Sequence, residues 1–202
     1  MSRDVFFILL GYLSGSILFA RVAAKLLGKE DCFLSSKDQN PGTANAFLCG
    51  GFLCGLLTLL GDLVKGWLPV HLYLLATEAS RPELALVLAA PVLGTAFPLF
   101  HRFQGGKGIA VTFGCLLGLL PFGTPVFLFA GSFLFFSLIV RVKPHFYRTI
   151  VVYLFTLFLM LRLHLSAPVC AGFCLITMTV CCKLHQSKEV REKMKVQILW
   201  KH

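Results

Sequence analysis

The sequence predicts an all-α integral membrane protein of about seven transmembrane helices, some of them short or broken. Hydrophobic residues make up 57% of the 202 residues and charged residues only 14%, which is more apolar surface than a soluble domain of this length can bury. The hydrophobic residues also fall into blocks long enough to cross a bilayer, which takes about 20 residues per helix. We expect one polytopic domain at 1–182 and a basic, amphipathic cytoplasmic tail at 183–202.

The composition argues against a nucleic-acid-binding protein and against a protein built on disulfides or a metal site. The formal net charge is +10, but the basic residues lie mostly in short loops and the tail, without an aromatic-interleaved soluble surface, so we expect no nucleic-acid partner. Seven of the eight cysteines lie in apolar blocks, and no Cys-x-x-Cys pair has a histidine partner. We therefore expect small core residues rather than a disulfide framework or a metal site, and no cofactor.

The hydrophobic blocks define the predicted spans. The first block has no small-residue cleavage site, so we interpret it as a retained span rather than a signal peptide. The second is unusually long and is expected to break near Gly61-Asp62, and the fourth is short and ends at Pro121. Such interruptions are tolerated where protein or water satisfies the backbone. The predicted spans, with ends good to a few residues, are 4–27, 46–76, 83–100, 108–120, 122–140, 146–163 and 166–182.

The basic residues predict the orientation of the chain in the membrane. Fourteen of them lie near alternate loops, around 28–45, 101–107 and 141–148, or in the tail from Lys183, whereas the opposite side carries only three. Because loops rich in Lys and Arg stay in the cytoplasm, we expect an external N-terminus and a cytoplasmic C-terminus.

Small residues in the first span predict a close contact between helices. Gly11, Ser14, Gly15 and Ser16 would let the backbone of a neighbouring helix approach closely. We interpret this segment as a packing surface.

A glycine-rich turn on the cytoplasmic side is a candidate binding site. Lys107 stands among three glycines in Gly105-Gly106-Lys107-Gly108. Glycine adopts positive φ, so successive N–H groups can form an anion-binding nest. A helix beginning at Gly108 would direct its N-terminal dipole at the same point. The turn is either such a phosphate cradle or a tight turn with a snorkelling lysine, and the four residues alone do not decide between them.

The first cytoplasmic loop holds a second candidate. Asn40-Pro41-Gly42 is a strong turn signal, and Thr43 or Asn45 can cap the helix that follows. The loop is either simply capped or a second polar wall that faces Gly105–Gly108.

Two ionisable residues fall inside the second span. Asp62 and Lys65 are three residues apart, hence on one helical face, and ionisable groups in a span need a partner or a water-filled cavity. They form either a structural ion pair or a place where Lys65 meets an anionic substrate. The length of the span favours the second interpretation.

Two further basic stretches lie in loop 141–148 and in the C-terminal tail. Loop 141–148, which begins with Arg141, binds phosphates or lipid headgroups, or else only sets the topology. The tail spaces Val190, Met194 and Ile198 between basic residues, a pattern typical of a short amphipathic surface helix.

Taken together, these stretches resemble the bacterial acyl-phosphate:glycerol-3-phosphate acyltransferases, the PlsY family. The resemblance runs through most of the chain and rests on the order and spacing of several short motifs. It implies a seven-helix enzyme of the bacterial cytoplasmic membrane, with its active face in the cytoplasm. The motifs are Gly15-Ser16, Asn40-Pro41-Gly42 followed by Asn45, Asp62-x-x-Lys65-Gly66, Phe97-Pro98 and Gly105-Gly106-Lys107-Gly108.

The resemblance implies transfer of a fatty acyl group from acyl phosphate to the 1-hydroxyl of glycerol 3-phosphate, giving lysophosphatidic acid and phosphate for phospholipid synthesis. The implied partners are these two substrates and membrane lipid. Acyl phosphate is already activated, so positioning and charge stabilisation take the place of a Ser or Cys nucleophile, and the donor's phosphate is expected to assist proton removal. The implied catalytic residues are Lys107, Asn45 and Arg141, and the implied binding residues are Gly105, Gly106, Gly108, Asn40, Gly42, Thr43, Lys65 and Ser36.

The chain departs from the family's motifs at several positions. Thr95 stands where the family has a histidine before Phe-Pro, and Pro144 stands near an expected serine. His101, His145 and His185 are candidate replacements for a lost function. Two alternatives therefore stay open: a non-catalytic relative that binds phospholipid precursors or a partner enzyme, and a small transporter, which the broken spans and intramembrane charges suggest.

Overall fold

The structure is a computed structural model that describes residues 2–29, 41–187 and 194–198. These residues are almost entirely helical, with short 3₁₀ and π-helical segments and two paired strands. The elements are α1 (Arg3–Gly15), α2 (Phe19–Leu26), α3 (Thr43–Gly50), α4 (Phe52–Ala76), α5 (Leu84–Ala96), η2 (Leu99–His101), α6 (Ile109–Leu117), α7 (Thr124–Leu134), η3 (Phe135–Ile139), β1 (Val140–Lys143), α8 (His145–Arg162), α9 (Ala167–Gln186) and β2 (Lys195–Ile198).

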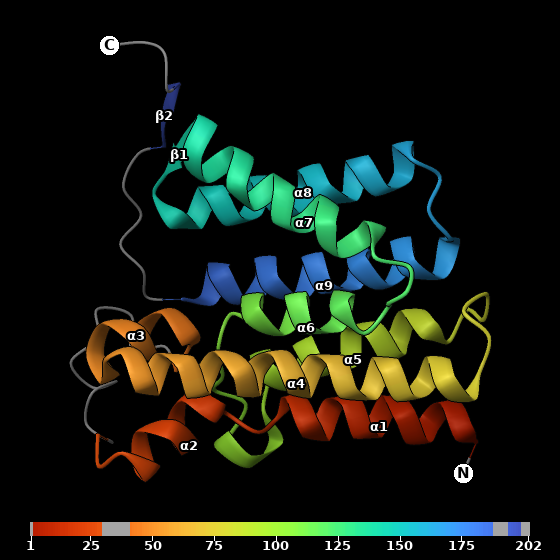
Figure 1. The fold of residues 1–202 in the computed structure, drawn as a ribbon, viewed down its shortest axis with the longest axis horizontal. Helices are drawn as coiled ribbons and strands as arrows, with labels where there is room; N and C mark the ends of the chain where they lie inside the picture. Colours follow the sequence, from red (N-terminus) through yellow and green to blue (C-terminus); the bar gives the residue numbers. More distant parts are fainter. Residues whose placement is uncertain (1, 30–40, 188–193, 199–202) are drawn as a thin grey trace.

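The long helices lie side by side in layers (Figure 1). α5 packs against α1 and α9, α4 packs against α1 and α6, and α7 packs against α8. α9 lies between the α7–α8 pair and the layer that contains α4, α5 and α6. Aromatic rings fill the core between these layers, where the ring centroid of Phe129 is 4.9 Å from that of Tyr153 and 5.6 Å from that of Phe173. Such edge-to-face pairs add to the stabilisation from apolar burial.

The close contact predicted for the first span is confirmed, and its partner is α5. A methyl group on Gly15 would collide with the backbone of Pro91, and one on Gly94 would collide with the backbone of Tyr12. The Tyr12 hydroxyl also donates a 2.8 Å hydrogen bond to the Phe97 carbonyl. Glycine therefore lets α1 and α5 touch backbone to backbone.

Several of the helices have the length and composition of membrane spans. α4, the segment Leu84–His101, α8 and α9 are each long and apolar enough, and α1 with α2 makes a fifth such segment with a 43° bend. The second half of the bundle also contains the shorter apolar segment Thr124–Ile139. The prediction of an all-α membrane protein is thus supported, while the exact number of seven spans stays a prediction.

The predicted break in the second span was placed wrongly. α4 runs without interruption through Gly61 and Asp62, and the chain breaks instead at Gly51, between α3 and α4. Gly51 has φ 82° and ψ 179°, a conformation that only glycine adopts readily. Gly61 lies inside α4 and faces the ring of Phe19, where any side chain would collide, so this glycine allows close packing rather than a break.

The tail also differs from its prediction. α9 continues to Gln186, four residues beyond the predicted end of the last span. Lys195–Ile198 form strand β2 rather than part of a helix, and they pair antiparallel with β1 in the register Val140↔Ile198. The remaining tail residues, 188–193 and 199–202, lie outside the described part of the chain.

The connections collect at the two ends of the bundle (Figure 1). α3, α6 and α8 begin at one end, and the chain's N-terminus and the α4–α5 connection lie at the other. The loops 101–107 and 141–148, which precede α6 and α8, therefore lie at the same end, as the distribution of basic residues predicted. At the N-terminal end, Arg81 forms an ion pair with Asp4 at 3.2 Å, and the hydrogen bond from Arg81 to Glu83 raises the pKa of that guanidinium.

Candidate active site

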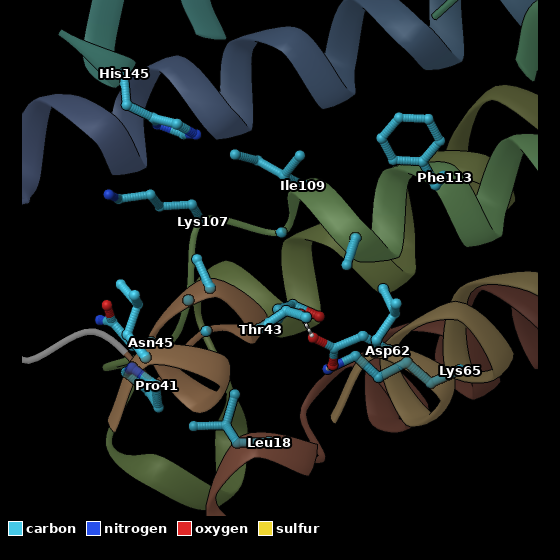
Figure 2. Close-up of a pocket in the computed structure, with 18 residues that line it drawn as sticks. Leu18, Pro41, Thr43, Asn45, Asp62, Lys65, Lys107, Ile109, Phe113 and His145 are labelled. Carbon is cyan, nitrogen blue, oxygen red and sulfur yellow. Dashed lines mark hydrogen bonds and ion pairs between the residues drawn. The ribbon is translucent and has the colours of Figure 1, made fainter. Parts of the chain in front are cut away.

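A cavity of about 430 Å³ opens at the end of the bundle where α3, α6 and α8 begin. Figure 2 shows side chains entering it from α3, from the middle of α4, from the segment before α6 and from α8. The lining residues are Leu18, Pro41, Gly42, Thr43, Ala44, Asn45, Leu48, Leu59, Asp62, Lys65, Thr95, Gly106, Lys107, Gly108, Ile109, Ala110, Phe113 and His145.

Three helix N-termini meet at this cavity. The first residues of α3, α6 and α8, which are Thr43, Ile109 and His145, all belong to its lining. The N-cap residues of these helices, Gly42, Gly108 and Pro144, have no polar side chain that could form a capping hydrogen bond. A helix N-terminus has backbone N–H groups without intrahelical partners and carries a partial positive charge, so each of the three favours an anion.

The glycine-rich turn before α6 has the backbone geometry that its sequence predicts. A methyl group on Gly105 would collide with the Thr95 carbonyl oxygen, and the Gly106 N–H donates a 3.0 Å hydrogen bond to that same oxygen. Gly108 has φ 76° and is the N-cap of α6, which begins one residue later than expected. The turn therefore requires glycine, and it brings Lys107 to the cavity wall (Figure 2).

Asp62 joins two of the predicted binding residues. Its carboxylate accepts a 3.0 Å hydrogen bond from the Thr43 hydroxyl and forms a 2.8 Å ion pair with Lys65. Lys65 also donates a 2.8 Å hydrogen bond to the Ile17 carbonyl, at the bend between α1 and α2. Asp62 and Lys65 are only 7% and 4% exposed. The structural ion pair thus exists, and it ties the start of α3 to α4 and to the α1–α2 bend.

Thr43 does not cap α3 as its position in the sequence suggested. Gly42 is the N-cap residue, and the Thr43 hydroxyl is directed to Asp62 instead. The cap prediction for Thr43 is therefore wrong, because a tertiary contact with α4 provides a charged acceptor for the hydroxyl.

The cavity brings together most of the predicted site residues, but it does not include all of them. Gly105 is buried in the turn yet does not contribute to the lining, and Arg141 lies exposed on β1, also outside the lining. Asn40 and Ser36 fall outside the described residues. The predicted residues that line the cavity are Gly42, Thr43, Asn45, Lys65, Gly106, Lys107 and Gly108.

Thr95 and His145 also line the cavity. The sequence pointed to Thr95 only as a departure from the family's motif and to His145 only as one of three candidate replacements for a lost function. The Thr95 hydroxyl lies 2.9 Å from the Pro91 carbonyl oxygen and 3.1 Å from that of Gly15, so its single proton is shared between two backbone acceptors. His145 follows Pro144 as the first residue of α8. The pattern Pro-His before an apolar run could have indicated a helix start there, but not that this start faces Lys107.

The family model for glycerol-3-phosphate acyltransferases matches residues 5–194. The chain belongs to the glycerol-3-phosphate acyltransferase family. This confirms the family resemblance that the short motifs indicated.

Two bacterial relatives of this chain are named glycerol-3-phosphate acyltransferases. Glycerol-3-phosphate acyltransferases of Cupriavidus taiwanensis and Bordetella pertussis are 43% and 45% identical to this chain, over 58% and 56% of its length. The matched regions span 59% and 53% of those relatives.

Two crystal structures share the fold across nearly the whole chain. They are the glycerol 3-phosphate form and the lysophosphatidic acid form of PlsY, an integral membrane glycerol 3-phosphate acyltransferase. Their TM-scores are 0.79 and 0.78, at 22% and 23% identity, with 92% of this chain covered and 90% and 89% of theirs. The fold of this chain is therefore that of an integral membrane protein of the PlsY type.

Proposed function

We propose that this protein is a membrane acyltransferase that moves a fatty acyl group from acyl phosphate to the 1-hydroxyl of glycerol 3-phosphate. The products are lysophosphatidic acid and phosphate, for phospholipid synthesis. The observation that carries the proposal is the meeting of three helix N-termini and Lys107 at one cavity. Both substrates are phosphate esters or anhydrides, and such a cavity suits anions of this kind. PlsY itself has structures in glycerol 3-phosphate and lysophosphatidic acid forms.

The chemistry needs positioning more than it needs a nucleophilic side chain. Acyl phosphate is a mixed anhydride with a good leaving group, so the acceptor hydroxyl attacks the carbonyl carbon directly. Holding the two reactants in the reactive geometry supplies a large part of the rate enhancement. Backbone N–H groups and cations aimed at the phosphates stabilise the negative charge that develops as the anhydride bond breaks.

The lining residues divide between phosphate binding and positioning. Lys107 and the N-terminus of α6 bind a phosphate, and Asn45, on the first turn of α3, is a further polar contact in the lining. Lys65 acts mainly through its ion pair with Asp62, which fixes where α3 begins relative to α4. Arg141 remains a predicted cationic contact, although its side chain lies outside the cavity lining.

The apolar part of the cavity suits the acyl chain. Leu18, Leu48, Leu59 and Ile109 contribute aliphatic surface, and Phe113 stands farther along α6 (Figure 2). The ring of Phe113 lies 4.6 Å from that of Phe129, centroid to centroid. An acyl chain placed along this wall has its carbonyl end at the cationic rim and its tail among hydrophobic residues.

The orientation in the membrane is part of the proposal. In this proposal the chain has seven spans, the N-terminus lies outside and the C-terminus lies in the cytoplasm. The cavity is at the end of the bundle that carries the basic loops before α6 and α8. Charged substrates then reach it from the cytoplasm, and the membrane is the bacterial cytoplasmic membrane.

The test uses purified protein in detergent or lipid cubic phase with palmitoyl phosphate and glycerol 3-phosphate. Phosphate and lysophosphatidic acid are followed together, and we expect them to appear in equal amounts. Phosphate without lysophosphatidic acid would indicate hydrolysis or another acceptor.

One observation favours a second candidate. Thr95 stands where the family has a histidine, and its hydroxyl is already shared between two backbone acceptors. A non-catalytic relative would bind glycerol 3-phosphate but form neither product, so the same assay distinguishes the two functions.

A further inference from the structure

Phe113 lies where the apolar wall of the cavity ends on α6. The described residues of α6 that line the cavity are Ile109, Ala110 and Phe113, although the helix continues beyond Phe113. With a rise of about 1.5 Å per residue, Phe113 lies about 7.5 Å along the helix axis from the N-cap, Gly108. The part of the cavity that follows α6 therefore ends at this ring (Figure 2).

The Phe113 ring is held in place by aromatic side chains of α7. Its centroid lies 4.6 Å from that of Phe129 and 5.8 Å from that of Phe133. Phe129 is fully buried, so an acyl chain that meets the Phe113 ring cannot push it aside without disturbing a close-packed core. A chain that is longer than the wall has to bend at the ring.

The helix that carries Phe113 is fixed as well. A methyl group on Gly114 of α6 would collide with the Leu63 carbonyl oxygen of α4, and one on Gly66 of α4 would collide with the Val111 carbonyl oxygen of α6. The two helices therefore touch backbone to backbone. Because they cannot slide or separate without losing this contact, the cavity that both of them line keeps its width.

We propose that Phe113 sets the length of the acyl chain that the protein prefers. The inference rests on the proposed function and adds the chain-length specificity of the donor to it. One acyl chain of a bilayer spans about 15 Å, half of the hydrocarbon core, so a chain whose carbonyl lies beside Gly108 reaches past Phe113 when it follows α6. Chains that end before the ring lie extended along the wall. Longer chains bend at the ring, and this misfit lowers kcat/KM for their donors.

The first test is a competition between donors of different chain length, with glycerol 3-phosphate as the acceptor. Decanoyl, myristoyl, palmitoyl and stearoyl phosphate are supplied as an equimolar mixture in the same lipid vesicles, and the lysophosphatidic acids formed are resolved by mass spectrometry. Phe113→Ala should raise the ratio of the longest to the shortest product by about 10-fold or more, because one methylene in an apolar pocket is worth about 10–200-fold. The wild type and the variant meet the same mixture, so differences in how the donors partition into the membrane cancel.

The second test changes the same wall in the opposite direction. Ala110 lines the cavity on α6, about one turn nearer to Gly108 than Phe113 is. Ala110→Leu should shorten the available space and lower the ratio of long to short products. Phe113→Leu, which keeps more of the packing than alanine does, should raise the ratio by a smaller factor than Phe113→Ala. Shifts of opposite sign from two positions on one helix are not expected from general damage to the fold.

Phe173→Leu is the control for damage to the aromatic core. The Phe173 ring lies 5.6 Å from that of Phe129, centroid to centroid, and is not among the described residues of the lining. This variant should lose stability in thermal unfolding but keep the wild-type ratio of products.

Two results would overturn the proposal. An unchanged ratio in Phe113→Ala would show that the chain leaves the cavity before it reaches the ring, and an equal loss of all products would show that the ring is only structural. If the wild type forms no lysophosphatidic acid from any donor, the proposed function fails. If the wild type is active and the ratio does not respond to Phe113→Ala, only this inference fails.

Discussion

Lys65 and Lys107 line the same cavity but are placed there by different means. Lys65 is held in α4 by Asp62 and by the Ile17 carbonyl, whereas Lys107 is brought to the wall by a turn that only glycine can form. We therefore assign the direct phosphate contact to Lys107 and the organisation of the site to Lys65. Each assignment leads to a prediction for a single substitution.

Lys107→Ala should abolish most of the activity without affecting folding. Loss of one positioned donor from a transition-state site costs about 10²–10³-fold in rate, and the backbone turn does not depend on the lysine side chain. Lys143→Ala, which removes an exposed lysine from β1, is the control and should be near wild type. Turnover of a Lys107→Ala variant at the wild-type rate would exclude the lysine as a phosphate anchor.

Asp62→Asn should destabilise the protein as well as slow it. The substitution leaves Lys65 charged and buried without its counter-ion, which costs about 3–5 kcal/mol. Chemical denaturation in detergent measures the change. Replacing both residues at once, as in Asp62→Leu with Lys65→Met, removes the unpaired charge and should recover much of the stability but not the activity. Equal stability of Asp62→Asn and the wild type would contradict a structural role for the ion pair.

At the scale of elements, the contact between α1 and α5 holds Thr95, which lines the cavity. Thr95 lies in the last turn of α5 and bonds to the α1 carbonyl of Gly15, and the 99–108 segment that leads to α6 starts from the same place. The Leu99 N–H in turn donates to the Ser16 hydroxyl at 3.2 Å. A change in the spacing of these two helices would therefore move the glycine-rich turn.

Gly94→Ala should accordingly be harmful although it adds only one methyl group. That group would collide with the Tyr12 backbone, and overpacking of this kind costs about 1–3 kcal/mol. Gly131→Ala on α7 is the matched control, because nothing lies within 4 Å of its added methyl, and it should be neutral or stabilising by about 0.5–1 kcal/mol. Thermal unfolding compares the pair, and equal melting temperatures would argue against the backbone contact.

At the scale of the whole molecule, the bundle sorts its connections into two ends, and the candidate active site lies at one of them. α3, α6 and α8 all start at that end (Figure 1), so their N-terminal dipoles add at one place. An arrangement with any one of these helices reversed would place a C-terminal dipole beside the phosphates, which repels anions.

The orientation prediction can be checked by labelling single cysteines in intact cells. Ser80→Cys lies exposed in the α4–α5 connection and Gln104→Cys lies exposed before α6, at opposite ends of the bundle. In a background from which the eight native cysteines are removed, a membrane-impermeant maleimide should label Ser80→Cys directly and Gln104→Cys only after permeabilisation. The reverse pattern would place the cavity outside the cytoplasm.

The sequence alone was sufficient for the membrane class, the helical character of the chain and the family. These follow from local properties, since the length of an apolar block and the spacing of a short motif do not depend on distant contacts. It also identified the small residues of α1 as a packing surface and the glycines around Lys107 as a turn. Both inferences follow from the small size and the backbone freedom of glycine, which are properties of the residue itself.

Only the tertiary structure decided how these segments meet. The break at Gly51, the Thr43 contact with Asp62 and the position of Arg141 outside the cavity each depend on residues far apart in the chain. The same holds for the approach of His145 to the cavity that contains Lys107. A pattern along the chain can show that a helix begins at a residue, but where three such beginnings converge is determined by helix packing, which is a property of the assembled bundle.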